Sequence, residues 1–285
     1  MYIATSLLFL LGANLVKAAP LQDASKDEMS AQIIGGTPVK SGELPFVVGY
    51  NVGQGFCTAS LITDKVALTA AHCVLPNSRN PYISYGNTNV DRGTRINIKR
   101  ALRHPGYTDE GVKDDIALLF LEKPIILGPN AQPVRVEKID PSAGEKVWAA
   151  GFGCIRDPGG PVSSDLLKVD QTIKDAAYCK KNYPGLNPTA GATVCVAPEK
   201  NKSVCYGDSG GPLYKISNGN VTLIGVTSFG VGGRYFGGGF DFDRSLLRKA
   251  GILIFHTFLD GKMISYFTRV EHYRDWLKLN GVEIP

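Results

Sequence analysis

One serine in this chain stands in a loop that favours close contact with a ligand. Ser209 lies in Gly207-Asp208-Ser209-Gly210-Gly211-Pro212, where an acid precedes it and glycines surround it. Glycine permits backbone conformations that other residues avoid and lets the main chain approach a ligand. Such a loop can turn its N–H groups inward and hold a hydroxyl out toward a substrate. A Gly-Asp-Ser-Gly string is also a common turn, so its meaning depends on the rest of the chain.

A histidine and an acid upstream supply what a serine nucleophile needs. His72 lies in Thr69-Ala70-Ala71-His72-Cys73, and Asp115 lies in Asp114-Asp115-Ile116-Ala117-Leu118-Leu119. A serine hydroxyl is a weak nucleophile at its own pKa and requires an adjacent base. Histidine, with a reference pKa of about 6.5, can take that proton and return it to a leaving amine. The order His, Asp, Ser is one of those in which this triad occurs, so we expect Ser209 to attack, His72 to act as base and Asp115 to orient it.

Six motifs in this order resemble the trypsin/chymotrypsin family of serine proteases. They are Ile33-Ile34-Gly35-Gly36, the segments around His72 and Asp115, Gly207–Pro212, Ser228-Phe229-Gly230 and Thr268-Arg269-Val270. The resemblance covers residues 33–285 and implies an all-β fold, with two six-stranded antiparallel β-barrels, a short C-terminal helix and an active site between the barrels. It implies a secreted serine endopeptidase that works through an acyl-enzyme. The alternative is a non-catalytic binding protein on the same fold.

The resemblance also assigns roles around the triad. The family pattern Asp-Ile-Ala-Leu-Leu places the catalytic acid directly before isoleucine, which selects Asp115 over Asp114. The N–H groups of Gly207 and Ser209 are expected to form the oxyanion hole, and one such donor is worth about 10²–10³ in turnover. Ser228 is similar to the serine that supports the catalytic aspartate, and the backbone of residues 228–230 is expected to pair with the substrate.

The motif at Ile33 implies activation by cleavage. In the family, a cut before this segment frees an α-ammonium group that pairs with the aspartate preceding the catalytic serine, here Asp208. Removing one partner of such a buried pair costs about 3–5 kcal/mol. The residue before Ile33 is Gln32 rather than arginine or lysine. We therefore expect a precursor whose activating protease is not trypsin-like.

The substrate pocket departs from the trypsin pattern. Ser203 stands at the pocket floor, where trypsin-like members carry an aspartate, and Gly230 is expected to keep one wall open. This resembles chymotrypsin-type preference for large apolar or aromatic residues. An insertion at about residues 234–259 follows, and it is either a genuine specificity loop or intron-derived sequence retained in the chain. Asp241 or Asp243 within it offers an acid that would restore a preference for basic residues.

Six cysteines fit a disulfide-bonded protein better than a metal site. The resemblance implies the pairs Cys57–Cys73 and Cys179–Cys195. Relatives also carry a cysteine that pairs with the equivalent of Cys205, but no cysteine follows Cys205 here. Cys154 and Cys205 both flank the oxyanion loop, and their pairing stays open.

Composition and the N-terminus limit the compartment and the partners. The short apolar run before Val16-Lys17-Ala18-Ala19 predicts a signal peptide at residues 1–19, and a polar, charged stretch at residues 20–32 predicts a pro-segment. Abundant glycine (33) and turn-separated apolar runs favour a β-rich fold, which we divide into residues 33–136 and 137–285. Because the net charge of +5 is modest and the basic residues are scattered along the chain, nucleic acid is not expected as a partner.

We expect protein or peptide substrates, regulation by protein inhibitors and a monomer. No cofactor, metal or membrane contact is expected.

Overall fold

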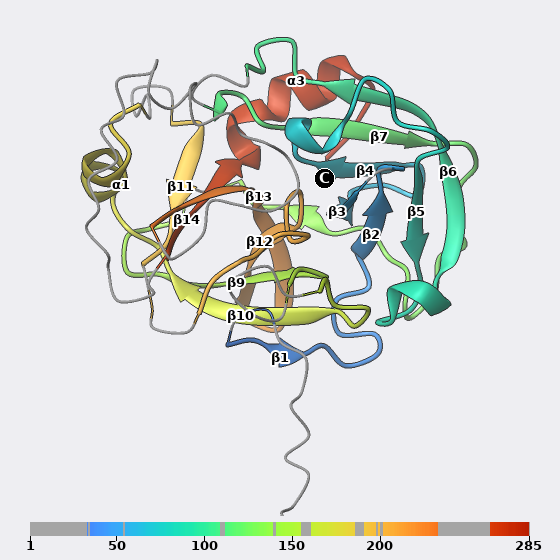
Figure 1. Cartoon of the computed structure of the whole chain (residues 1–285), viewed down its shortest axis with the longest axis horizontal. Helices are drawn as coiled ribbons and strands as arrows, with labels where there is room; N and C mark the ends of the chain where they lie inside the picture. Colours follow the sequence, from blue (N-terminus) through green and yellow to red (C-terminus); the bar gives the residue numbers. More distant parts are fainter. Residues whose placement is uncertain are drawn as a thin grey trace, which may run out of the picture. The chain divides into compact units, whose positions relative to one another are not determined.

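Six short runs rich in branched apolar residues form a closed antiparallel barrel (Figure 1). Leu61, Leu68, Ile83 and Leu118 are shielded from solvent in its core, and burying a side chain of this size is worth about 1.5–3 kcal/mol. The strands are β2 (Val47–Asn51), β3 (Phe56–Leu61), β4 (Val66–Thr69), β5 (Tyr82–Tyr85), β6 (Thr94–Arg103) and β7 (Ala117–Leu121). They close in the order β2-β3-β4-β7-β6-β5, which is the first of the two predicted barrels.

The chain is seen in a computed structural model that describes residues 33, 35–53, 55–108, 112–138, 141–154, 161–185, 191–197, 199, 202–232 and 263–284. The predicted signal peptide and pro-segment and the insertion at residues 234–259 lie outside the described residues.

Six strands from the second half of the chain, together with β1 and β8 from the first half, form a second sheet rather than a fully paired barrel. Its strands are β1 (Thr37–Pro38), β8 (Arg135–Val136), β9 (Lys146–Gly151), β10 (Leu167–Thr172), β11 (Thr193–Cys195), β12 (Pro212–Ser217), β13 (Asn220–Gly232) and β14 (Met263–Arg269). Their order is β1-β10-β9-β12-β13-β14-β11, with β8 beside β13. The ends of β10 and β11 meet through one bridge between Ile173 and Val196. Six of these strands, β10-β9-β12-β13-β14-β11, thus form a ring that is closed by one bridge instead of a ladder.

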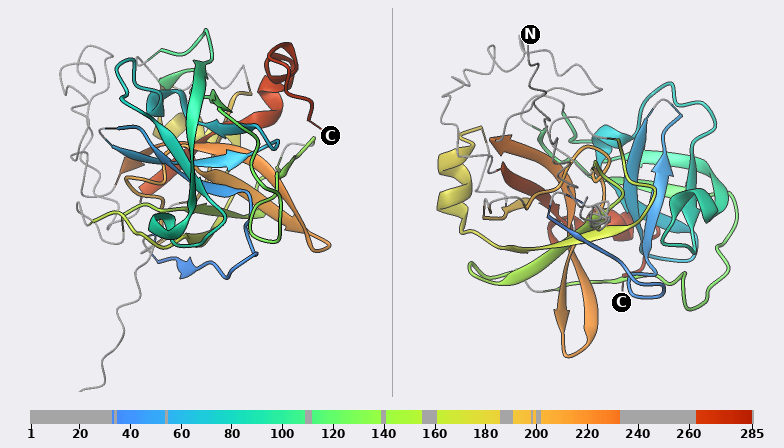
Figure 2. Two further views of the ribbon diagram at one scale, coloured as in Figure 1. Left: turned by 90° about the vertical axis from the view of Figure 1, so that its right-hand side faces the viewer. Right: turned by 60° about the horizontal axis from the view of Figure 1, so that its bottom comes forward.

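Two neighbouring strands of this sheet determine where the insertion begins and ends. β13 and β14 are antiparallel and remain paired up to Gly232 and Met263. Residues 233–262 therefore connect the adjacent ends of one hairpin. At its other end, β13 pairs with β12 through a tight turn at Asn218 and Gly219, both with positive φ, as hairpin turns favour (Figure 2).

Two short helices complete the described fold, with three 3₁₀ turns η1 (Ala71–Cys73), η2 (Val90–Arg92) and η5 (Val270–Tyr273). The C-terminal helix α3 (Arg274–Leu279) was expected, and its Leu277 packs into the core cluster of the first barrel. The helix α1 (Ala176–Asn182) was not expected from the sequence. Asp175 caps it by accepting a 2.7 Å hydrogen bond from the Tyr178 N–H.

Candidate active site

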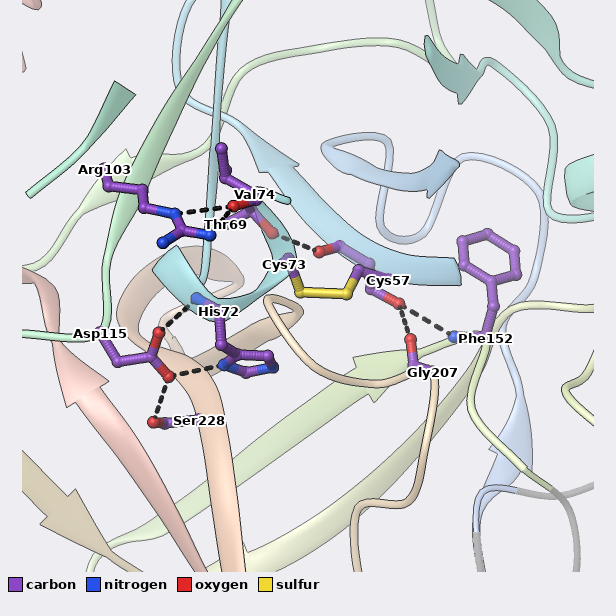
Figure 3. Close-up of a disulfide and its surroundings, with 11 residues drawn as sticks. Cys57, Thr69, His72, Cys73, Val74, Arg103, Asp115, Phe152, Gly207 and Ser228 are labelled. Atoms are coloured by element: carbon purple, nitrogen blue, oxygen red, sulfur yellow. Dashed lines mark hydrogen bonds and ion pairs between the residues drawn. A yellow bond between two sulfur atoms is a disulfide. The ribbon is translucent and has the colours of Figure 1, made fainter. Parts of the chain in front are cut away.

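His72 is held by its neighbours in the chain. It lies on η1, directly after β4, and the adjacent Cys73 is joined by a disulfide to Cys57 on β3. The Cα atoms of the two cysteines are 6.3 Å apart. Two strands of the first barrel therefore position the imidazole (Figure 3).

Asp115 holds the imidazole from the side. Its Oδ2 lies 2.8 Å from His72 Nδ1, and its Oδ1 accepts a 2.9 Å hydrogen bond from the His72 backbone N–H. Ser228 Oγ donates to the same Oδ2 at 2.5 Å (Figure 3). Two contacts from one residue fix both the position and the tilt of the ring, and the Nδ1 contact favours the tautomer that leaves Nε2 as a base.

The carboxyl group of Asp115 is fully buried and remains ionised. Burial pushes its pKa upward, but the charge of His72 and the hydrogen bonds from His72 and Ser228 outweigh this and hold the pKa below its ordinary value. Thr268 Oγ1 also donates to the Asp115 backbone oxygen at 2.8 Å. Strand β14 of the second sheet thus supports an acid that comes from the first barrel.

Asp114 turns to a different partner. Its backbone has φ of 50°, and its Oδ1 accepts a 2.8 Å hydrogen bond from the Tyr273 hydroxyl. Its Oδ2 lies 3.8 Å from Lys113 Nζ and 3.9 Å from His104 Nδ1. The structure therefore brings Asp115, and not Asp114, to His72.

The loop that carries Ser209 packs against the first barrel. The Thr58 N–H donates to the Ser209 backbone oxygen at 2.9 Å, and Thr58 Oγ1 donates to the Gly207 oxygen at 2.8 Å. Thr58 directly follows Cys57, whose disulfide holds the histidine turn. One residue of β3 thus ties the serine loop to the element that positions His72. Sequence analysis did not single out Thr58, because a threonine inside a strand carries no motif.

Two glycines are required by this packing. Gly207 has φ of 96° and Gly210 has φ of 79°, a region that residues with a Cβ rarely enter. A Cβ on Gly210 would lie 2.0 Å from Thr69 Oγ1 and 3.0 Å from the Ala70 nitrogen. The serine loop therefore touches the chain just before His72, and any larger residue at 210 would push the two apart.

The backbone around Ser209 leaves two donors for a ligand. Gly210 N–H donates to the Thr227 oxygen and Gly211 N–H to the Asp208 oxygen, both at 2.8 Å. The N–H groups of Gly207 and Ser209 donate to no acceptor in the part of the chain that the structure describes. Since backbone donors are nearly always paired, these two are available to a substrate oxygen.

Asp208 is fully buried beneath this loop. Its two carboxylate oxygens accept hydrogen bonds of 2.8 Å each, from the backbone N–H groups of Gly153 and Cys205. Burial nevertheless raises the pKa of this carboxyl to about 7, and no basic side chain pairs with it among the described residues. The side chain of Ile33 is buried in the core of the second sheet.

Of the expected pocket residues, Ser228 and Gly230 lie on β13, and Ser203 lies in the segment that precedes the serine loop. Ser203 and Ser228 are buried, and Ser228 contacts Asp115 as described above. Gly230 does not face open space, because a Cβ there would lie 2.4 Å from Met263 Sδ. Met263 and the neighbouring Ser265, whose buried hydroxyl has no partner among the described residues, were not predicted. Ser265 is the cross-strand partner of Gly230, and Met263 pairs with Gly232 and reaches Gly230 with its side chain. The sequence does not reveal this pairing across a 30-residue connection.

Three disulfides are formed. Cys57–Cys73 and Cys179–Cys195 are the two pairs implied by the resemblance, and the third joins Cys154 to Cys205, with Cα atoms 5.4 Å apart. The Cys154 N–H also donates to the Tyr206 oxygen at 2.7 Å. The pairing left open by the sequence thus connects the segment just before the serine loop to the segment just after β9.

Cys57, His72 and Cys73 make up the one candidate metal grouping in the described ranges, and their sulfurs are already bonded to each other. No described helix has the length and apolar character needed to span a bilayer.

Comparison with known proteins places this geometry in a family. The family model described as Trypsin matches residues 33–239. Serine protease 1 of Rattus norvegicus is 33% identical over 80% of this chain and 88% of its own length, and Cationic trypsin-3 of Rattus norvegicus is 31% identical over 80% and 88%.

The fold has a solved counterpart. The structure of neuropsin, a serine protease expressed in the limbic system of mouse brain, matches 86% of this chain and 98% of its own with a TM-score of 0.68 and 23% identity. The family model covers more than half of the chain and spans His72, Asp115 and Ser209. The chain belongs to the trypsin family of serine proteases and is a serine-type endopeptidase.

Proposed function

We propose that Ser209 is the nucleophile of this endopeptidase, His72 its general base and acid, and Asp115 the residue that orients His72. The observation that carries the proposal is the buried, ionised Asp115 in contact with both His72 Nδ1 and the His72 backbone. A buried carboxylate in this position fixes one tautomer and stabilises the imidazolium that forms during catalysis.

The proposed reaction begins at the Ser209 hydroxyl. Ser209 Oγ bonds to the scissile carbonyl carbon as His72 Nε2 takes the hydroxyl proton. The negative charge on the carbonyl oxygen is met by the unpaired N–H groups of Gly207 and Ser209. His72 passes its proton to the leaving amine, which departs with the C-terminal product. Water then repeats the sequence on the acyl-enzyme and frees Ser209.

Activation is proposed to require a cut before Ile33. Asp208 supports this, because a fully buried carboxyl with no cationic partner among the described residues is a site prepared for a positive charge. The α-ammonium group of a chain beginning at Ile33 would supply that charge and hold the oxyanion loop in place. Residues 1–19 and 20–32 are proposed as the signal peptide and pro-segment that are removed.

The preferred substrate residue on the acyl side is proposed to be large and apolar or aromatic. Ser203 is neutral and buried at the expected pocket floor, and the Met263 thioether against Gly230 adds an apolar wall. Relatives named trypsin favour a second candidate, cleavage after lysine or arginine. That outcome would require an acid from the insertion, with Asp241 and Asp243 the first residues to test.

We propose that the protein is secreted, because three disulfides in one chain are typical of proteins in an oxidising compartment. A family of proteases implies protein or peptide substrates, and we propose that this one acts as a monomer and is controlled by protein inhibitors.

A peptide library tests the proposed function. A fusion partner that is removed to leave Ile33 as the N-terminus provides the mature chain, and mass spectrometry identifies the cut sites. We expect cleavage after Phe, Tyr, Leu or Met, and a loss of about 10⁵–10⁶ in turnover in His72→Ala. A folded mature chain that binds peptides without cutting any of them would support the alternative of a non-catalytic binding protein.

A further inference from the structure

The Cys154–Cys205 disulfide lies beside the two hydrogen bonds that hold the Asp208 carboxylate. The Gly153 N–H, one residue before Cys154, donates to Asp208 Oδ1 at 2.8 Å, and the Cys205 N–H donates to Asp208 Oδ2 at the same distance. The Cα atoms of the two cysteines are 5.4 Å apart. One covalent bond therefore joins the two backbone segments between which the buried acid is held.

One of these segments also sets the direction of a proposed oxyanion donor. Because a peptide bond is planar and trans, its C=O and N–H groups point in opposite directions. In the peptide unit that joins Tyr206 to Gly207, the Tyr206 oxygen accepts a 2.7 Å hydrogen bond from the Cys154 N–H. That bond on one side of the unit therefore aims the Gly207 N–H on the other side.

Gly207 itself does little to resist a rotation of this peptide unit. Glycine passes more easily than other residues between backbone conformations, and Gly207 has a φ of 96°. The restraint comes instead from its surroundings, because a Cβ on Gly207 would lie only 3.0 Å from Gly153 Cα. A cross-link at the next residue, Cys154, keeps this neighbouring segment in place.

This disulfide is also the one that a reagent in solution reaches most easily. Five of the six cysteines are buried, whereas Cys205 is partly exposed and is followed by the exposed Tyr206. Thiol–disulfide exchange requires that a thiolate reach one sulfur atom of the bond. An external dithiol therefore meets Cys205 before it meets the sulfurs of the other two disulfides.

We propose that the Cys154–Cys205 disulfide positions the Gly207 N–H for catalysis, and that an external dithiol lowers the activity of the protease by reducing it. The two cysteines act through the backbone of the serine loop and do not touch the substrate. The proposal deepens the proposed function and rests on it for the role of the Gly207 N–H.

The reduction takes place in two exchange steps. One thiolate of the dithiol attacks Cys205 Sγ, the bond between the two cysteines breaks, and Cys154 leaves as a thiolate that takes up a proton. The second thiol of the reagent then attacks the mixed disulfide and releases Cys205 as a thiol. The protein gains two electrons and two protons, and the dithiol becomes a disulfide.

Graded reduction of the folded chain matured at Ile33 tests the proposal. The chain is treated with dithiothreitol, which is then removed. One portion is alkylated with iodoacetamide and mapped by mass spectrometry, and the rate at which a fluorophosphonate labels Ser209 is measured on the other. We expect Cys154 and Cys205 to be alkylated first, and the labelling rate of the reduced chain to fall about 10- to 100-fold.

This expected loss is smaller than the factor of about 10²–10³ for the removal of one oxyanion donor, because the reduced loop still visits its active conformation. Reoxidation of a portion that was not alkylated should restore the rate. Reduction of either buried disulfide before this one, or an unchanged labelling rate once Cys154 and Cys205 are reduced, overturns the proposal.

Paired variants separate positioning from a general loss of stability. Replacing Cys154 and Cys205 by Ala keeps every backbone N–H described above, so only the cross-link is lost. We expect kcat per folded molecule to fall about 10- to 100-fold. Replacing Cys179 and Cys195 by Ala removes a disulfide between α1 and β11 and should leave kcat per folded molecule unchanged. An equal fall in both variants overturns the proposal.

Amide hydrogen exchange on the intact and the reduced wild type does not depend on catalysis. We expect exchange in residues 205–211 to accelerate at least about tenfold on reduction, and exchange in β3 to stay the same. Faster exchange in a chain whose intact form takes no fluorophosphonate supports the positioning of the loop and contradicts the proposed function. Unchanged exchange after reduction overturns the positioning, whatever the chain does to substrates.

Discussion

The carboxyl of Asp208 should make the stability of the uncut chain depend on pH. Its pKa is raised from 3.8 to about 7 by burial, so the folded state binds a proton more tightly than the unfolded state. Stability is therefore highest when both states are protonated, and it falls as the pH rises through the folded pKa. A shift of about three units corresponds to about 4 kcal/mol, of which about 2–3 kcal/mol is lost between pH 5 and pH 8.

Urea unfolding from pH 5 to pH 8 measures this loss. The full-length chain carries Ser209→Ala so that it cannot digest itself, and the readout is the difference in free energy of unfolding between Asp208 and Asp208→Asn. Taking the difference cancels the titration of His72 and of other carboxyls. We expect the two chains to converge at low pH and the Asp208 chain to lose about 2–3 kcal/mol relative to the variant as the pH rises.

The same urea experiment is then carried out on a chain that begins at Ile33. The proposed α-ammonium group would pair with Asp208 and lower its pKa, so the relative loss between pH 5 and pH 8 should disappear. Asp275→Asn, which changes an exposed carboxyl, serves as the control, and the difference in free energy of unfolding between Asp275 and Asp275→Asn should not change with pH. An uncut chain with the same pH dependence as Asp208→Asn, or a mature chain that keeps the slope, would refute the reasoning.

Three further outcomes follow from the structure. Asp115→Asn should lower kcat by about 10⁴ and Asp114→Asn by far less, and comparable losses in steady-state assays would mean that the wrong acid was assigned. Ser203→Asp should shift cleavage weakly toward Lys and Arg in the peptide library, and an unchanged profile would remove Ser203 from the pocket. Replacing Cys154 and Cys205 by Ala should lower the free energy of unfolding in urea by about 4 kcal/mol, since the bond closes a loop of 51 residues. Equal stability of the two chains would show that this disulfide does not stabilise the fold.

The sequence predicted most of what lies within motifs. His72 and Asp115 could be placed because each sits in a short pattern with a chemical reason, and the structure brings them into contact. Apolar runs separated by turns indicated a β-rich fold, and the family resemblance implied the barrel. The C-terminal helix was implied by the same resemblance, and the structure confirms it at Arg274–Leu279.

The rest depends on contacts between distant parts of the chain. Thr58 and Gly207 are 149 residues apart. Neither a threonine in a strand nor a glycine in a loop carries a sequence signal for a contact between the two. Met263 reaches Gly230 only because β13 and β14 pair up to the ends of the insertion. Helix α1 is seven residues long, too short for a clear period, although the cap at Asp175 was a usable signal.

The most direct measurement of the central claim is labelling with a fluorophosphonate, which reacts only with an activated serine. The chain matured at Ile33 is incubated with the probe at neutral pH, digested and mapped by mass spectrometry. We predict one label per chain, on Ser209, and almost none in His72→Ala, because the hydroxyl is weakly nucleophilic without its base. A folded mature chain that takes no label, or that labels equally well in His72→Ala, would contradict the assignment of Ser209 and His72 as a catalytic pair.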